Sequence, residues 1–98
     1  MIIKKKQENN KMVIELDGRL DTNTAPKLEE EVNNVLDNIE NLEINMENLQ
    51  YIASAGLRVL LSLHKKIMKK GTMVIVGVNE TVMEVFKVTG FSDILTIK

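Results

Sequence analysis

Ser54 and His64 are the two residues whose types, taken together, suggest nucleophilic catalysis. The chain has one histidine and no cysteine, so His64 is the only imidazole base available to a serine nucleophile. A helix containing both residues would separate them by roughly 15 Å along its axis, because each residue rises about 1.5 Å. A serine–histidine dyad is therefore excluded, and we expect no enzymatic activity.

His64 falls in an apolar stripe with Leu60, Leu61 and Ile67. We expect a packed, hydrogen-bonded histidine here, and a functional role is the alternative. One histidine without cysteine does not supply a zinc site, and the acidic residues lack the spacing of a calcium loop. No phosphate-binding glycine motif is present. The sequence therefore predicts no metal, no cofactor and no nucleotide chemistry.

Length and charge restrict the class of protein. A chain of 98 residues with 44% hydrophobic residues predicts a single domain over residues 1–98. Lys and Arg number 13 against 14 Asp and Glu, a net charge of -1 that does not favour a nucleic-acid partner. The lysines at positions 65, 66, 69 and 70 have no aromatic residues between them, so we interpret them as a solvated face.

The same composition bears on the compartment. No apolar run approaches the roughly 20 residues that a membrane-spanning helix needs. The absence of cysteine fits a reducing environment. We therefore expect a cytoplasmic protein without a membrane partner.

Hydrophobic periodicity predicts the elements of the first half of the chain. An N-terminal hairpin turns at Asn9 and Asn10, and Gly18 ends its second strand. A helix is expected over residues 24–38, capped by Thr22, Asn23 or Thr24. A strand over residues 42–46 follows, and then a connection over residues 47–52.

The second half alternates helices and strands. A helix begins near Ser54 and ends before Gly71, with a buried stripe of Leu57, Leu60, Leu61, Ile67 and Met68. The apolar strand over residues 72–76 is expected to be central, parallel and covered on both faces. Asn79 caps a helix over residues 80–88, and residues 94–97 form the last strand. The order β-β-α-β-α-β-α-β predicts an α/β domain with a mixed, mostly parallel sheet.

A run of small residues, Ala53 to Gly56, stands at a predicted strand-to-helix junction around Ser54. Small side chains leave the backbone uncovered, and a helix N-terminus presents free N–H groups with partial positive charge. Such a position suits close approach by another protein, and it suits a phosphoserine. The alternative is that Ser54 is an ordinary N-cap.

Several short motifs together resemble the STAS domain family, and specifically its small stand-alone anti-sigma factor antagonists. They are Tyr51-Ile52 followed by Ser54-Ala55-Gly56-Leu57, Gly18-Arg19-Leu20-Asp21 with Ala25, Asn45, and Thr89-Gly90-Phe91. The resemblance covers essentially the whole chain. It implies a STAS-type single domain whose helices pack mainly on one face of the sheet.

The resemblance also implies a function. An antagonist of this kind, when unphosphorylated, binds an anti-sigma factor that is also a serine kinase, and thereby frees a sigma factor. The kinase inactivates it by phosphorylating one residue, which Ser54 matches, and a PP2C-type phosphatase reverses the step. The implied partner-binding surface comprises Asp21, Thr22, Asn23, Ala53, Ser54, Ala55, Gly56 and Arg58.

Two positions keep alternatives open. Many family members carry aspartate or serine where this chain has Ala53, so the alternative function is a STAS scaffold or sensor subunit that is never phosphorylated. Arg58 lies four residues after Ser54, within reach of a phosphate or of an acidic partner residue. The alternative for Arg58 is a solvated helix arginine.

Overall fold

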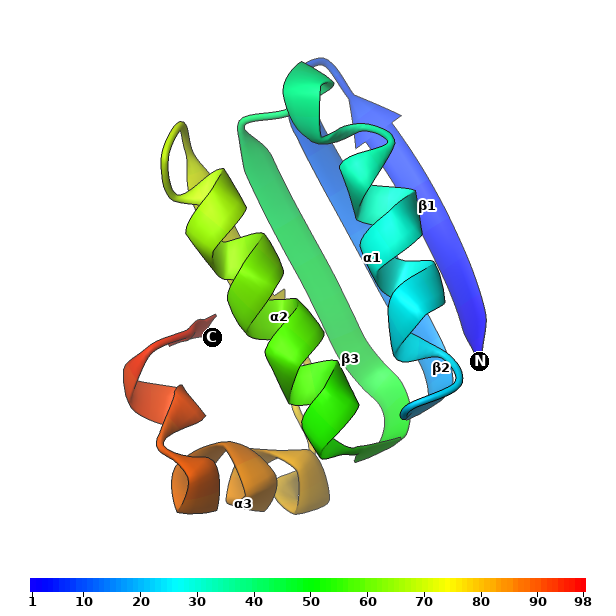
Figure 1. The fold of residues 1–98 in the computed structure, drawn as a ribbon, viewed down its shortest axis with the longest axis vertical. Coiled ribbons are helices and arrows are strands. Elements are labelled where there is room, and N and C mark those ends of the chain that lie inside the picture. Colours follow the sequence, from blue (N-terminus) through cyan, green and yellow to red (C-terminus); the bar gives the residue numbers. More distant parts are fainter.

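A computed structural model describes residues 1–98 and confirms the α/β order (Figure 1). The strands are β1 (Ile2–Glu8), β2 (Lys11–Leu20), β3 (Asn41–Ile52), β4 (Thr72–Val76) and β5 (Thr96–Ile97). The helices are α1 (Ala25–Asn33), α2 (Ser54–Ile67) and α3 (Glu80–Thr89). Short 3-10 turns follow α1 at Leu36–Asn38 and α3 at Phe91–Asp93.

One five-stranded sheet, in the order β1-β2-β3-β4-β5, carries the helices. β1 and β2 form the predicted antiparallel hairpin, and every other neighbouring pair is parallel. Figure 1 shows α1 and α2 side by side across one face, with α3 beyond the end of α2. The prediction of helices mainly on one face is confirmed.

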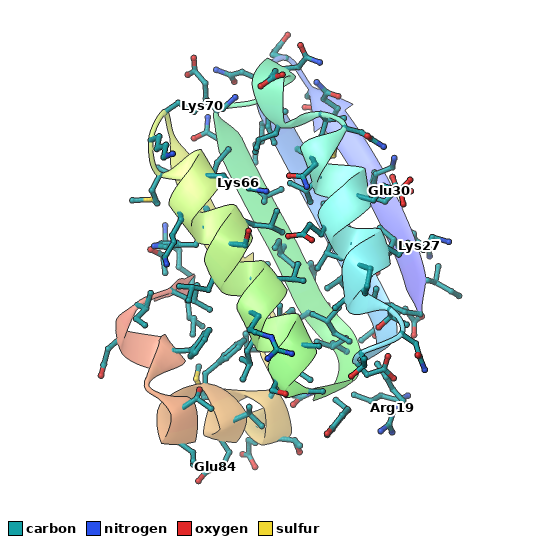
Figure 2. The ribbon with its side chains drawn as sticks, in the orientation of Figure 1. Arg19, Lys27, Glu30, Lys66, Lys70 and Glu84 are labelled. Carbon is teal, nitrogen blue, oxygen red and sulfur yellow. The ribbon has the colours of Figure 1, made fainter.

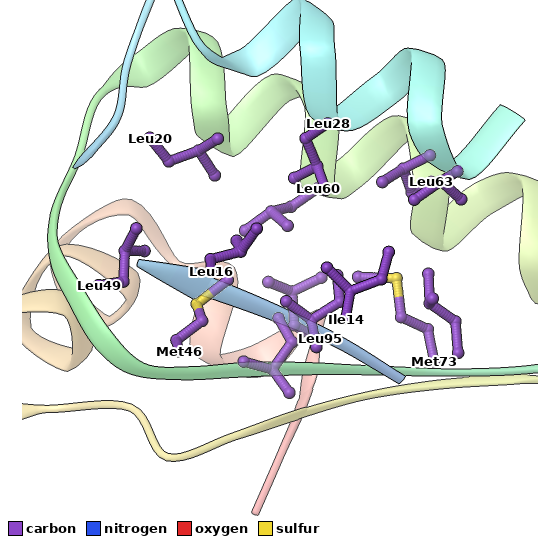
Figure 3. Close-up of a cluster of buried hydrophobic side chains, with 14 of the residues drawn as sticks. Ile14, Leu16, Leu20, Leu28, Met46, Leu49, Leu60, Leu63, Met73 and Leu95 are labelled. Carbon is purple, nitrogen blue, oxygen red and sulfur yellow. The ribbon is translucent and has the colours of Figure 1, made fainter. Parts of the chain in front are cut away.

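The core lies between that face and the helices (Figure 3). It is one cluster of 22 buried hydrophobic residues, and no buried residue is polar or charged. The two-residue period of β2 explains which of its side chains enter the core, because Met12, Ile14 and Leu16 are buried while the alternate residues are not. Aliphatic and methionine side chains fill most of this space, as the 3% aromatic content requires.

The opposite face of the sheet corrects one expectation. β4 is parallel and paired on both edges, as predicted. It is not covered on both faces, because Met73 and Ile75 are buried whereas Val74 and Val76 remain half-exposed. No helix crosses that face (Figure 1).

The strands β2 and β3 are longer than predicted. Gly18 does not end β2, and residues 47–52 belong to β3 rather than to a connection. The pairing shifts register on either side of Asp17 and Gly18, and Gly18 takes a φ of 114° that favours glycine. These irregularities let both strands continue while Leu49 and Ile52 still reach the core.

Helix boundaries and faces need smaller corrections. α1 ends at Asn33 instead of position 38, because a 3-10 turn replaces its last turn. On α2, Met68 is 51% exposed, and Leu63 takes the expected place of Met68 in the core. The last strand is only Thr96–Ile97, and Ile94 precedes it in an exposed position. Asn79 caps α3 as predicted, since its side chain accepts a hydrogen bond from the Val82 N–H at 2.8 Å.

Candidate phosphorylation and partner-binding site

Ser54 is the first residue of α2 and its side chain is exposed. The hydroxyl makes no hydrogen bond within the protein, so the alternative that Ser54 is an ordinary N-cap is wrong. Ala53 occupies the cap position in an extended conformation and has no side chain able to cap. Its carbonyl accepts the first helical bond, from the Leu57 N–H at 3.1 Å. The N–H groups of Ser54, Ala55 and Gly56 therefore precede the helical ladder and face the same end as the free hydroxyl.

Gly56 explains why small residues gather at this junction. A Cβ atom at Gly56 would lie 2.8 Å from Cγ of Leu20 and 3.0 Å from the Leu20 carbonyl oxygen. The first turn of α2 thus packs directly against the end of β2. The Ala53 N–H donates to that same Leu20 oxygen at 2.9 Å. These contacts fix Ser54 close to the loop that follows β2.

The loop after β2 is organised by Asp21. One carboxylate oxygen accepts the backbone N–H groups of Asn23 at 3.0 Å and Thr24 at 3.1 Å. The Thr24 hydroxyl lies 2.8 Å from the Arg19 carbonyl oxygen and accepts the Asp21 N–H. Of the three cap candidates, Thr24 precedes α1, but its side chain bonds back into the loop instead of capping the helix.

The same contacts set the charge of Asp21. Desolvation raises the pKa of this carboxyl, but the N–H groups of Thr24 and Asn23 outweigh it. The Thr24 hydroxyl and the positive charge of Arg19 act in the same direction. The net result is a pKa below the ordinary value of 3.8, so Asp21 is a carboxylate at neutral pH.

The sheet brings the two loops together. β2 and β3 are parallel, and Leu20 pairs with Ile52, so both chains leave the sheet at one edge. A hollow between α1 and α2 is lined by Thr22, Ala25, Pro26 and Glu29 on one side, and by Ala55, Arg58 and Val59 on the other. Thr22, Ala55 and Arg58 therefore line one hollow, and Asn23 is exposed in the same loop as Thr22. The Asp21 carboxylate is engaged within its own loop rather than with Ser54.

Arg19 and Tyr51 are neighbours of this site that sequence reasoning missed. The two residues are paired across β2 and β3, and the Arg19 guanidinium lies 4.5 Å from the centroid of the Tyr51 ring. Tyr51 is 40% exposed, and Figure 2 places Arg19 at the end of the sheet where β2 leads into α1. Two register shifts, between Glu15 and Asp17 and between Gly18 and Arg19, align the pair. Their trace in the sequence is the change from a spacing of two to a spacing of three between the buried residues of β3 after Met46.

His64 behaves differently from its prediction. It lies within α2 ten residues after Ser54, so the structure excludes the dyad. The ring is half-buried, but Nδ1 is buried without a hydrogen-bond partner. The residues three or four positions away on the helix, Leu60, Leu61 and Ile67, offer no polar side chain to it. The expectation of a hydrogen-bonded histidine is therefore wrong for Nδ1.

No three His, Cys, Asp or Glu side chains gather in a way that holds a metal ion. None of the helices combines the length and apolar character needed to span a bilayer. What the geometry offers is an exposed hydroxyl at a helix start, flanked by small residues and by one ordered acidic loop.

The family model of the STAS domain matches residues 1–98. The chain belongs to the STAS domain family. The expectation drawn from the short motifs is thus confirmed over the whole sequence. Asp21, in the loop after β2, and Ser54, at the start of α2, belong to the motifs that carry the resemblance, and both follow strands that end at the same edge of the sheet.

Similar proteins match this chain over most of its length. An anti-sigma-B factor antagonist of Listeria monocytogenes is 32% identical over 97 residues, covering 96% of this chain and 84% of the relative. An anti-sigma factor antagonist from Mycobacterium paratuberculosis has the same fold, with a TM-score of 0.87, 22% identity and coverage of 98% and 83%. SpoIIAA in its unphosphorylated form gives a TM-score of 0.80 at 17% identity, with coverage of 99% and 87%.

Proposed function

We propose that this STAS domain is an anti-sigma factor antagonist that is switched off by phosphorylation of Ser54. Unphosphorylated, it binds an anti-sigma factor that is also a serine kinase, and a sigma factor is released. A PP2C-type phosphatase restores the binding form, and these partners place its action in the cytoplasm. The observation that carries the proposal is the exposed Ser54 hydroxyl, which no group in the fold uses.

The similar proteins support this assignment. The Listeria monocytogenes relative is named an anti-sigma-B factor antagonist. The structural neighbour SpoIIAA has been solved in unphosphorylated and phosphorylated forms. A modification that leaves the STAS fold intact is consistent with a serine outside the core, and Ser54 is such a residue.

The partner-binding surface in this proposal joins the two loops. Asp21, Thr22 and Asn23 contribute from the loop before α1, and Ala53, Ser54, Ala55, Gly56 and Arg58 from the start of α2. The small residues allow a partner backbone to approach the helix end closely. The Asp21 carboxylate keeps its loop in one shape, so little conformational entropy is lost on binding.

Phosphorylation acts on this surface rather than on the fold. A phosphate on Ser54 carries a charge of about -1.5 to -2 and stands at the positive end of α2, where it is tolerated. A partner surface complementary to a neutral hydroxyl then meets bulk and negative charge. A loss of about 3 kcal/mol suffices, because it weakens binding by about two orders of magnitude.

A scaffold or sensor subunit is the second candidate, and Ala53 is the observation that favours it. Its methyl group supplies no carboxylate beside Ser54 for a kinase to recognise. Such a subunit would still use the surface between the loops. It would differ in that Ser54 stays unmodified and Ser54→Asp changes partner binding little.

One experiment separates the two candidates. The protein is isolated from its own cells under growth and stress conditions, and its intact mass is measured and fragmented to locate a phosphate. We expect one phosphate on Ser54 that is absent from Ser54→Ala. The matched binding measurement is the Kd for the co-purifying anti-sigma factor, which Ser54→Asp should raise about a hundredfold while Ser54→Ala leaves it near wild type. An unmodified Ser54 under every condition would favour the scaffold.

A further inference from the structure

The charge of α2 and its flanks is one-sided. From Asn48 to Asn79 the sequence contains no Asp or Glu, and its cations are Arg58, Lys65, Lys66, Lys69 and Lys70. All 14 acidic residues lie before or after this stretch, although the whole chain has a net charge of only -1. The exposed side of α2 is therefore a local positive surface on a nearly neutral protein.

These cations do not all have the same surroundings. The Lys66 ammonium reaches across to Asn33 on the α1 side at 3.2 Å, and the Lys70 ammonium donates to the Leu36 carbonyl oxygen. Figure 2 shows Lys66 in the space between the two helices. Arg58 and Lys65, by contrast, have no hydrogen bond or ion pair with the protein, and both are exposed.

The helix dipole explains the positive charge of Lys65 but not that of Arg58. Lys65 lies in the last turn of α2, where a cation is stabilised by the carbonyl end of the helix. Arg58 is the fifth residue of α2, toward the positive end, where a cation gains nothing from the dipole. Its positive charge is not explained by the stability of the fold.

Two shallow hollows on this side of α2 share the Arg58 side chain. One is the hollow between α1 and α2 that contains Thr22, Ala55 and Val59. The other is lined by Arg58, Leu61, Ser62, Lys65 and Lys66. Arg58 and Lys65 are seven residues apart, so they lie on one side of the helix about 10 Å from each other along its axis. Leu61 lies between them and is half-buried.

We propose that Arg58, Leu61 and Lys65 form a docking surface for an acidic segment of the partner protein. The inference rests on the proposed function, because this surface begins four residues from Ser54 and continues away from it along α2. The spacing of the two cations defines the partner segment. Arg58 and Lys65, about 10 Å apart, fit two carboxylates roughly two helical turns apart on the partner, with an apolar side chain between them that contacts Leu61.

Glu29 sets the limit of this surface. Its side chain lines the first hollow opposite Arg58, and Glu29 takes part in none of the ion pairs of the protein. A partner carboxylate that entered this hollow would meet like charge on the α1 side. The acidic segment is therefore expected to run along the second hollow, toward Lys65.

The test is a charge reversal with a matched control. Arg58→Glu/Lys65→Glu is compared with Lys4→Glu/Lys98→Glu, which makes the same change in net charge on the uncovered face of the sheet. The Kd for the anti-sigma factor kinase isolated as described above is measured for each at low and high salt. We expect the Kd of the α2 variant to rise at least tenfold at low salt and less at high salt, with the control near wild type. Thermal unfolding confirms that both variants are folded.

The outcomes are distinguishable. If the α2 variant binds as the wild type does while Ser54→Asp still weakens binding, the docking surface is overturned and the proposed function stands. If the wild type binds no anti-sigma factor, both are overturned. A labelled random-sequence DNA duplex serves as the competing probe. If the wild type binds it and the α2 variant does not, the surface is a nucleic-acid contact instead.

Discussion

The Arg19 guanidinium lies over the ring of Tyr51, with its Cζ atom 4.5 Å from the ring centroid, beside the loop that presents Ser54. The two side chains come from neighbouring parallel strands and are paired across them. An exposed cation–π contact of this kind contributes about 0.5–1 kcal/mol. It ties the last residues of β2 to those of β3, where both proposed partner-binding loops begin.

A double-mutant cycle on this pair is expected to show coupling. Arg19→Ala and Tyr51→Leu each remove the contact. In urea titrations, the free energy of unfolding should fall by about 0.5–1 kcal/mol less in the double variant than the sum of the two single losses. Strict additivity of the two single changes would show that the pair contributes nothing to the fold.

Gly56→Ala should destabilise the protein, although the same change usually stabilises a helix by about 1 kcal/mol. The added methyl would stand 2.8 Å from Leu20 Cγ and 3.0 Å from a backbone oxygen that does not move easily. We expect a net loss of about 1–3 kcal/mol in thermal or urea unfolding. Ser54→Ala, two residues earlier and without a bond to lose, is the control and should change stability by less than about 0.5 kcal/mol.

Leu63 and Met68 provide a direct test of which side of α2 is buried. Leu63→Ala should cost about 2–5 kcal/mol, since the side chain has 0% exposure. Met68→Ala should cost less than about 0.5 kcal/mol, since Met68 is 51% exposed. Equal losses for the two variants would mean that α2 is rotated about its axis relative to the structure described above.

Asp21 gives the protein a pH dependence of known sign. Its folded-state pKa is lowered, so its contribution to stability is complete above the ordinary pKa of 3.8 and is lost as the pH falls from there through the folded-state value. Asp21→Asn lacks this charge and should be less stable than wild type at neutral pH. The gap between the two should close in acid. Urea titrations across pH measure it, and a gap independent of pH would contradict the assignment of the effect to the carboxylate.

Gly71 and Gly90 should respond to alanine in different degrees. A Cβ atom at Gly71 would overlap the carbonyl oxygen of Glu40, the residue before β3, so Gly71→Ala forces the start of β4 away from the start of β3. At Gly90 nothing lies within 4 Å, and only the φ of 81° opposes a side chain, at a cost of about 1–2 kcal/mol. We expect Gly71→Ala to lower the melting temperature clearly more than Gly90→Ala does.

Much of the fold could be predicted because local patterns and global contacts agree. The alternation of Met12, Ile14 and Leu16 and the helix start at Ser54 depend on short stretches of sequence, and both are confirmed. The side of α2 that faces the sheet was harder to predict. Leu63 and Met68 both continue an apolar spacing, and the packing of α2 against its neighbours decides between them.

The candidate site was predictable in outline, and its details depend on register. Thr22, Ala55 and Arg58 do meet in one hollow. The Arg19 and Tyr51 pair, and the length of β3, follow from shifts in strand pairing at Asp17 and Gly18. After Met46 the buried residues of β3 are three positions apart instead of two, at Leu49 and Ile52. This break in period resembles the end of a strand until the pairing with β2 is seen.

The unbonded hydroxyl of Ser54 has an evolutionary consequence. Since no side chain or carbonyl of the fold depends on it, natural selection can act on position 54 without compensating changes elsewhere. Under the proposed function, one substitution of serine by threonine or by alanine would keep or abolish phosphorylation at this position. The neighbouring Gly56 has no such freedom, because β2 occupies the space that any side chain would need. Position 54 can therefore vary while the architecture two residues away stays under constraint.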